Sequence, residues 1–183
     1  MCVSDCHEGL RAAIGQVLGC PWQRCTVHFL RSMLGHCAKS QQPMISAAIR
    51  GIFSAGSGEE ARERLAEVVE RLEPIAPKVA QLVLDAEADL LGFYALPREH
   101  WSKLRSTNPL ERVNREIGRR TDVVGIFPND AALIRLAGSL LVEQNDEWLV
   151  ARRYLSQESL SAVLARDDHT QKEIKEVPTL SAA

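Results

Sequence analysis

Two acidic residues occupy positions where a carboxylate could bind a divalent metal ion. Asp5 follows a short stretch that reads as the end of a strand, and Glu111 lies near the start of a basic helix. Carboxylate oxygens suit Mg²⁺ and support metal-assisted chemistry at phosphate groups. Each residue also has a structural alternative, because Asp5 could cap the following helix and Glu111 could complete a capping box behind Asn108. The local sequence leaves these alternatives open.

A second motif pairs a cysteine with a histidine. Cys25 and His28 are three positions apart, and His36 and Cys37 follow further along the chain. Spacing of this kind can hold zinc. The alternative is a packing role, since Cys37 falls on the apolar stripe of its expected helix. A zinc-stabilised DNA-binding protein that uses all four residues is therefore one hypothesis.

Positive charges gather around Glu111. The whole chain has a net charge of −2, but six basic residues outnumber three acidic ones between Trp101 and Asp122. A basic strip of this kind can bind phosphates, or it can form ion pairs on a solvated helix face. Glu116 lies roughly 140° around the helix from Glu111, at about 100° per residue, so it is not expected to share the same site. The basic residues are Lys103, Arg105, Arg112, Arg115, Arg119 and Arg120.

The elements that must position these residues are mainly helical. With 45% hydrophobic and 25% charged residues, the chain has the composition of a soluble globular protein. Short strands are expected at 1–4 and 23–27, with a weaker third candidate at 123–127. Apolar periodicity predicts helices over 5–18, 28–38, 44–53, 59–72, 77–90, 108–121, 129–141 and 148–154.

Several classes of protein are disfavoured by what the sequence lacks. It contains five cysteines, an odd number, and no apolar run long enough to cross a bilayer, which favours a reduced, cytoplasmic protein without a membrane role. It has no Gly-x-Ser-x-Gly motif, no glycine-rich phosphate loop and no dinucleotide fingerprint. Serine hydrolases and nucleotide-binding folds are therefore not expected.

Six segments, taken in order, resemble the Mutator-type transposases of bacterial insertion sequences. The resemblance covers nearly everything from Val3 to about Leu160. The segments are Ser4–Leu10, Trp22–Phe29, Ser106–Asn114, Arg119–Thr121, Gly125–Asn129 and Glu143–Trp148.

The resemblance implies an α/β fold of the ribonuclease-H type, although this chain itself should be predominantly α-helical with two or three short strands. Residues 1–160 would form the C-terminal part of the catalytic domain. Within it, residues 28–95 would be an all-α insertion. Residues 161–183 are expected to be a disordered tail.

The family uses an Asp, Asp, Glu triad, and the resemblance assigns Asp5 to the second aspartate and Glu111 to the glutamate. Both would be catalytic metal ligands, with Cys25 and His28 matching a Cys-x-x-His motif between them. The implied cofactor is Mg²⁺, or Mn²⁺, in a two-metal site expected only in the full-length protein. The implied DNA-binding residues are Arg105, Arg112, Arg115, Arg119 and Arg120.

The implied partners are DNA, as insertion-sequence ends and target, and other transposase subunits, in the bacterial cytoplasm and on the nucleoid when DNA is bound. The family places its first aspartate upstream of anything in this sequence. The expectation is therefore a transposase fragment that is inactive alone. The alternative function is a non-catalytic helical module that binds or inhibits intact transposase.

Overall fold

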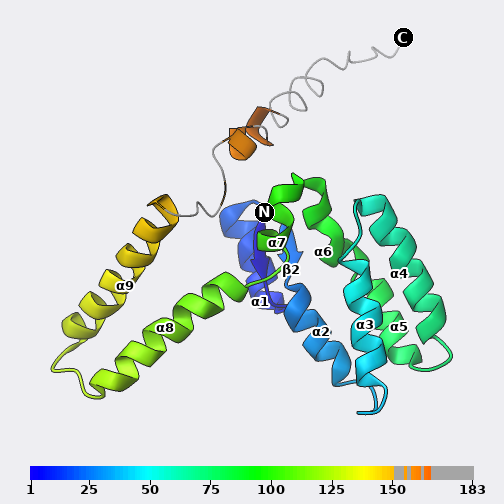
Figure 1. Cartoon of the computed structure of the whole chain (residues 1–183), viewed down its shortest axis with the longest axis horizontal. Helices are drawn as coiled ribbons and strands as arrows, with labels where there is room; N and C mark the ends of the chain where they lie inside the picture. The colour runs from blue at the N-terminus through cyan, green and yellow to red at the C-terminus, as the bar shows by residue number, and fades with distance from the viewer. Residues whose placement is uncertain (151–154, 156–157, 162, 166–183) are drawn as a thin grey trace, which may run out of the picture. The chain divides into compact units, whose positions relative to one another are not determined.

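The computed structural model describes residues 1–150, 155, 158–161 and 163–165 (Figure 1). The chain divides into two compact parts, Met1–Arg120 and Thr121–Ala183. The first part contains two strands and most of the helices, and the second contains one long helix. The predominance of helix agrees with the sequence prediction.

The elements of the first part run in the following order. The N-terminal portion has β1 (Cys2–Ser4), α1 (Glu8–Ala13), a π-helical turn η1 (Ile14–Leu18), β2 (Trp22–Arg24) and α2 (Thr26–Leu34). The helices α3 (Gln42–Ile52), α4 (Gly58–Leu72), α5 (Pro77–Asp85) and α6 (Glu87–Leu91) follow. Two 3-10 turns, η2 (Gly92–Ala95) and η3 (Arg98–His100), lead to α7 (Trp101–Leu104) and then α8 (Asn108–Val124).

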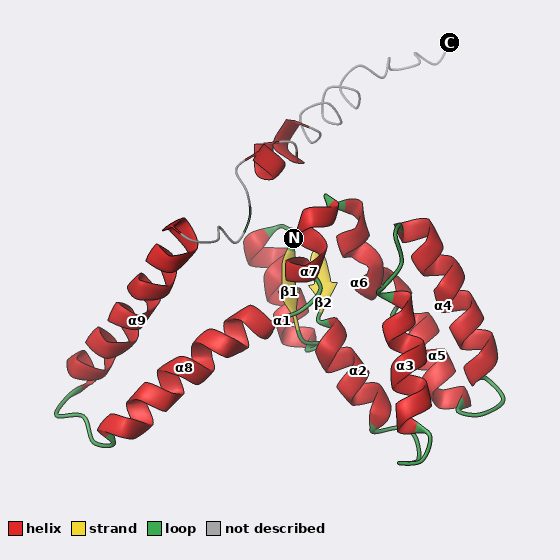
Figure 2. Ribbon diagram, viewed as in Figure 1, coloured by secondary structure: helices red, strands yellow, loops and turns green. Residues whose placement is uncertain are grey.

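The two strands form a parallel ladder (Figure 2). Cys2 pairs with Trp22 and Ser4 pairs with Arg24. The ladder continues beyond the strands, because the N–H of Cys25 donates to the carbonyl oxygen of Ser4 at 2.9 Å. Two of the expected strands are thus confirmed, and the residues that follow them, Asp5 and Cys25, emerge at the same edge of the sheet.

The third expected strand, at 123–127, is wrong. Val123 and Val124 belong to the last turn of α8. The helix stops at Gly125, whose φ of 72° places it in the left-handed region that glycine adopts without steric cost. The β-branched residues that suggested a strand are therefore helical.

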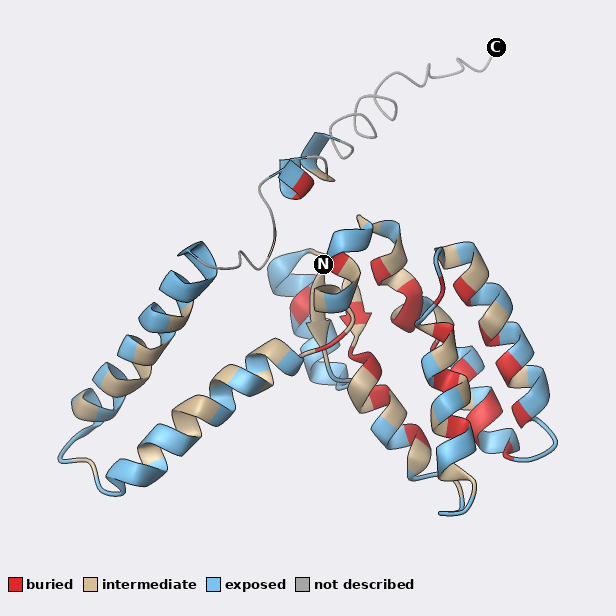
Figure 3. Cartoon of the chain, viewed as in Figure 1, coloured by how far each residue is buried: buried red, intermediate tan, exposed pale blue. Residues whose placement is uncertain are grey.

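The core of the first part is built by α2 to α6 (Figure 3). Each of these helices turns an apolar stripe inward, as the periodicity predicts. Pro77 starts α5 at a position where its missing N–H costs no hydrogen bond, and the Ser57 hydroxyl caps α4 by accepting from the N–H of Glu60. The largest buried side chains of this core are Phe29, Met33, Ile45, Ile49, Ile52, Leu65, Val79, Val83 and Leu90.

The long helix of the second part is α9 (Asp130–Val150). It is continuous across the break that the sequence analysis placed after residue 141. None of its residues is buried, and it exposes Ile134, Val142 and Leu149. Of the expected tail at 161–183, residues 161 and 163–165 are helical, while 162 and 166–183 lie outside the described residues. No helix within the described residues is both long enough and apolar enough to cross a membrane.

Candidate metal centre

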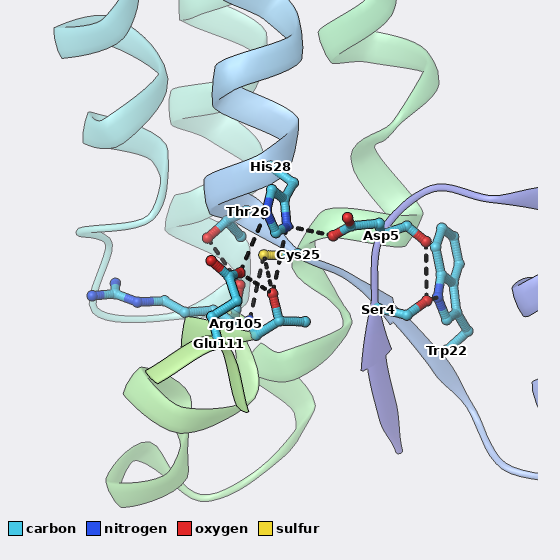
Figure 4. A network of polar contacts seen from close by, with 9 residues as sticks. Ser4, Asp5, Trp22, Cys25, Thr26, His28, Arg105 and Glu111 are labelled. Carbon is cyan, nitrogen blue, oxygen red and sulfur yellow. Dashed lines mark hydrogen bonds and ion pairs between the residues drawn. The ribbon is translucent and has the colours of Figure 1, made fainter. Parts of the chain in front are cut away.

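The register of the ladder brings Asp5 and Cys25 to one place. Because Ser4 pairs with Arg24, the next residues along both strands are neighbours at the carboxyl end of the sheet. Cys25 also occupies the N-cap position of α2, so His28 lies in the first turn of that helix. Asp5, Cys25 and His28 therefore converge (Figure 4).

The segment that precedes α8 is held against the start of α2 by two hydrogen bonds. The carbonyl oxygen of Arg105 accepts from both the N–H and the hydroxyl of Thr26, each at 2.9 Å. This contact fixes the loop that leads into α8 and carries Glu111 toward His28. α2 begins at Thr26, two residues earlier than the sequence predicts.

The imidazole of His28 lies between the two predicted catalytic carboxylates. Its Nδ1 contacts Oδ1 of Asp5, and its Nε2 lies 3.4 Å from Oε1 of Glu111. The side chains of Asp5 and Glu111 are 53% and 36% exposed, so both carboxylates can be reached from solvent. One imidazole ring therefore lies within ion-pair distance of both acidic side chains.

Thr107 links the other members of the cluster. Its hydroxyl donates to Oε1 of Glu111 at 2.8 Å and also lies 3.4 Å from both the Cys25 sulfur and Nδ1 of His28. Its backbone N–H donates to the same sulfur at 3.4 Å. A hydroxyl has one proton to donate, and the 2.8 Å contact shows that Glu111 receives it. Thr107 is not among the predicted site residues, although its place just before a helix is a usable signal.

The capping alternative for Asp5 is wrong. The N-cap of α1 is His7, whose Nδ1 accepts from the N–H of Leu10 at 3.4 Å. Asp5 is thereby left to contact His28. Glu111 does sit in the first turn of α8, where the helix dipole favours a negative charge. Its carboxylate nevertheless turns to Thr107 and His28.

The four-residue zinc hypothesis is not supported by the geometry. His36 and Cys37 lie beyond the C-terminal end of α2, whereas Cys25 and His28 lie at its start. Cys37 packs beside the helical core and donates its thiol to the carbonyl oxygen of Leu34. Within the described residues, the group with metal-binding geometry consists instead of Asp5, Cys25 and His28, whose ligand atoms lie within 4.8 Å of one another.

Three of the predicted DNA-binding arginines form hydrogen bonds to other groups of this chain. The guanidinium of Arg105 donates to the carbonyl oxygen of Phe53 at 3.2 Å, and Arg119 and Arg120 both bind Glu116. The hydrogen bonds from Arg119 and Arg120 lower the pKa of Glu116 to about 2. Glu116 is thus separate from the carboxylate cluster, as expected.

The two remaining predicted arginines, Arg112 and Arg115, are exposed on α8 near Glu111. Arg115 follows Glu111 by one helical turn, so the two residues share a face of the helix. A positive charge on this face adjoins the carboxylate cluster.

The donor set fits a hard divalent cation. Asp5 and Glu111 offer carboxylate oxygens from two different elements, and both are open to solvent. A magnesium ion usually keeps several water ligands and needs few protein carboxylates. The sulfur of Cys25 is buried and is not a ligand that magnesium favours.

Comparison with known proteins identifies the family. The family model described as "Transposase, Mutator family" matches residues 1–151. The chain therefore belongs to the Mutator family of transposases, as its motifs indicated.

Individual relatives agree with this assignment. The chain is 40% identical to the transposase for insertion sequence element IS1081 of Mycobacterium tuberculosis, over 98% of this chain and 44% of the relative. It is 40% identical to the ISRM5 transposase of Rhizobium meliloti, over 86% of this chain and 40% of the relative. It is 33% identical to the IS256 transposase in transposon Tn4001 of Staphylococcus aureus, over 84% and 40% respectively. The chain thus spans less than half the length of these relatives.

Proposed function

We propose that this chain supplies two of the three carboxylates of a metal-dependent transposase site that cleaves and joins DNA at the ends of an insertion sequence. Asp5 and Glu111 are the catalytic residues, and the fold of the whole enzyme is of the ribonuclease-H type. The observation that carries the proposal is that both carboxylates contact the ring of His28, although they come from opposite ends of the first part of the chain.

The cofactor in this proposal is Mg²⁺ or Mn²⁺, held by Asp5 and Glu111. When bound, such ions stabilise charge on the scissile phosphate and activate the attacking hydroxyl group. The chain's own residues orient the ligands. Thr107 fixes one oxygen of Glu111 by its hydrogen bond, and the β1–β2 ladder fixes the backbone of Asp5.

DNA is the proposed substrate, and the exposed arginines of α8 are its proposed contacts. Arg112 and Arg115 can neutralise backbone phosphates near Glu111. Arg119 and Arg120 can do so further along the helix once a phosphate replaces the carboxylate of Glu116. For Arg105 the same role requires its guanidinium to leave the carbonyl oxygen of Phe53.

The helices from residue 28 to residue 95 are proposed to be an all-α insertion between the second aspartate and the glutamate, within a catalytic-domain portion that spans residues 1–160. The first aspartate of the triad matches no residue among these 183. We therefore expect a protein made of these residues alone to bind Mg²⁺ or Mn²⁺ weakly and to leave DNA uncleaved. Association with further transposase subunits belongs to the same proposal.

A chimera tests the catalytic assignment. The matching 44% of the IS1081 transposase is replaced by this chain, and cleavage of the insertion-sequence end is measured with Mg²⁺. The chimera should cleave, and Asp5→Asn or Glu111→Gln should each lower the rate at least about a hundredfold. Glu8→Gln changes an exposed carboxylate outside the cluster and is the matched control; it should retain activity. A folded, DNA-binding chimera that fails to cleave, or one that Asp5→Asn leaves fully active, would contradict the proposal.

A further inference from the structure

The carboxylate cluster contains a feature that magnesium chemistry does not use, the thiol of Cys25. Its side chain is fully buried, yet its sulfur, a nitrogen of His28 and a carboxylate oxygen of Asp5 lie within 4.8 Å of one another. Thiol, imidazole and carboxylate together are the ligand set of zinc and similar transition metals. We propose that Asp5, Cys25 and His28 form a binding site for a divalent transition-metal ion of the zinc class.

The separations are close to those that zinc requires. Bond lengths of about 2.0–2.3 Å around a tetrahedral ion place its ligand atoms roughly 3.3–3.8 Å apart. The ligand atoms, which lie within 4.8 Å of one another, therefore need to approach by at most about 1–1.5 Å to close the site. Asp5 can make the adjustment, because its side chain is 53% exposed.

The surroundings of each ligand suit a bound metal. A metal-bound cysteine is a thiolate, and the backbone N–H of Thr107 already points at the Cys25 sulfur. The ring nitrogen that faces Asp5 is Nδ1, so the metal would bind there. The other nitrogen, Nε2, faces Glu111 at 3.4 Å. A carboxylate behind a metal-bound histidine is the usual arrangement in zinc sites.

The site is accessible to solvent on one side. Cys25 is buried and His28 is 24% exposed, whereas Asp5 is the most open of the three residues. A metal can therefore enter on the Asp5 side, and its fourth position is left for water or a substrate oxygen.

Zinc and magnesium should exclude one another in the whole enzyme, a consequence that rests on the proposed function. Asp5 would be a ligand in both states, and Glu111 would serve as the partner of His28 when zinc is bound. Binding of a zinc-class ion at Cys25 and His28 would thus withdraw both carboxylates from the catalytic site.

Cobalt binding tests the site without DNA and without cleavage. The full 183-residue chain is prepared with Cys2, Cys6, Cys20 and Cys37 changed to serine, which is reasonable because each of these thiols is at least partly exposed. Cys25 is then the single thiol. One equivalent of Co²⁺ should produce a thiolate-to-cobalt charge-transfer band in the near ultraviolet, and Cys25→Ser should abolish it. A missing band, or a band that survives Cys25→Ser, would overturn the proposal.

A second variant decides the matter if Cys25→Ser does not fold. Asp5→Asn changes an exposed ligand, and Glu8→Gln changes an exposed carboxylate outside the cluster. Zinc affinity, measured by competition with a chromogenic chelator, should fall at least about tenfold in Asp5→Asn, since even outer-shell partners of metal sites contribute 10- to 100-fold. Glu8→Gln should match the parent. Equal affinities in the two variants would overturn the site, whereas loss of DNA cleavage alone would bear only on the proposed function.

Discussion

The backbone N–H of Thr107 donates to the sulfur of Cys25 at 3.4 Å, which joins the start of α8 to the start of α2. The same residue holds Oε1 of Glu111 through its hydroxyl. One threonine therefore couples a tertiary contact between two helices to the orientation of a predicted catalytic carboxylate.

Replacing Thr107 by valine should separate these two contributions. Thr107→Val keeps the backbone N–H and the side-chain volume but removes the hydroxyl that Glu111 accepts. We expect a loss of about 1–2 kcal/mol in the free energy of unfolding, since the lost hydrogen bond is made to a charged group. Thr107→Ser keeps the hydroxyl and should lose less. Urea unfolding of the full chain measures both, and equal stability of the valine variant and the parent would contradict the assigned contact.

Gln23 joins the sheet to the helical core. It is fully buried in β2, where its amide donates to the carbonyl oxygen of Leu90 and accepts from the N–H of Phe93, each at 2.9 Å. Gln23→Ala leaves both backbone groups buried without these partners, so we expect a loss of about 2–4 kcal/mol. Gln81→Ala, at an exposed position of α5, should change stability by less than about 0.5 kcal/mol. Similar losses of stability in the two variants on thermal unfolding would show that the hydrogen bonds of Gln23 to Leu90 and Phe93 do not stabilise the fold as proposed.

The ion pairs of Glu116 on α8 should stabilise the fold in a pH-dependent way. Hydrogen bonds from Arg119 and Arg120 lower the pKa of Glu116 from 4.5 to about 2. Because the folded-state pKa lies below the unfolded value, the stabilisation is fully present above pH 4.5 and is lost as the pH falls through about 2. Titration of the Glu116 carboxyl carbon by NMR should show this low pKa. Changing Arg119 and Arg120 together to glutamine should return it toward 4.5, whereas Arg50→Gln should not.

Salt dependence should reveal which arginines contact DNA. If Arg112 and Arg115 each neutralise a phosphate, removal of either should flatten the slope of log affinity against log salt by about 0.9. Arg112→Gln and Arg115→Gln can be compared with Arg50→Gln, an exposed arginine on α3, by fluorescence anisotropy with duplex DNA. Three identical slopes would remove α8 from the proposed interface.

Much of the helical core was predictable, because each helix carries an apolar stripe that must be buried. Leu65 and Val68 of α4, and Val79 and Val83 of α5, are buried as their spacing requires. The two strands were also predictable as short extended stretches. The errors lie where helix and strand compete locally: Val123 and Val124 continue α8 until Gly125 ends it, and β-branched side chains alone do not show this.

The candidate site was predictable as a set of residues but not as an arrangement. Asp5, Cys25, His28 and Glu111 stand out by type and motif, but local sequence cannot show that one imidazole lies between two carboxylates. That arrangement depends on tertiary contacts, above all the hydrogen bonds between Thr26 and Arg105. Thr107 was missed in part for the same reason, since Cys25 and His28, which it contacts besides Glu111, are distant in the sequence.

The candidate metal centre depends on the parallel register of β1 and β2, because this register brings Asp5 and Cys25 together. Successive side chains of a strand point to opposite faces, so a slip of one residue between Ser4 and Arg24 would turn Asp5 or Cys25 away from the other. The paired stretch is only three residues long, so few hydrogen bonds of the ladder fix this register. The metal ligands should therefore come together only in the observed register. A cation that binds Asp5 and Cys25 should stabilise this pairing of β1 with β2 against a slip of one residue.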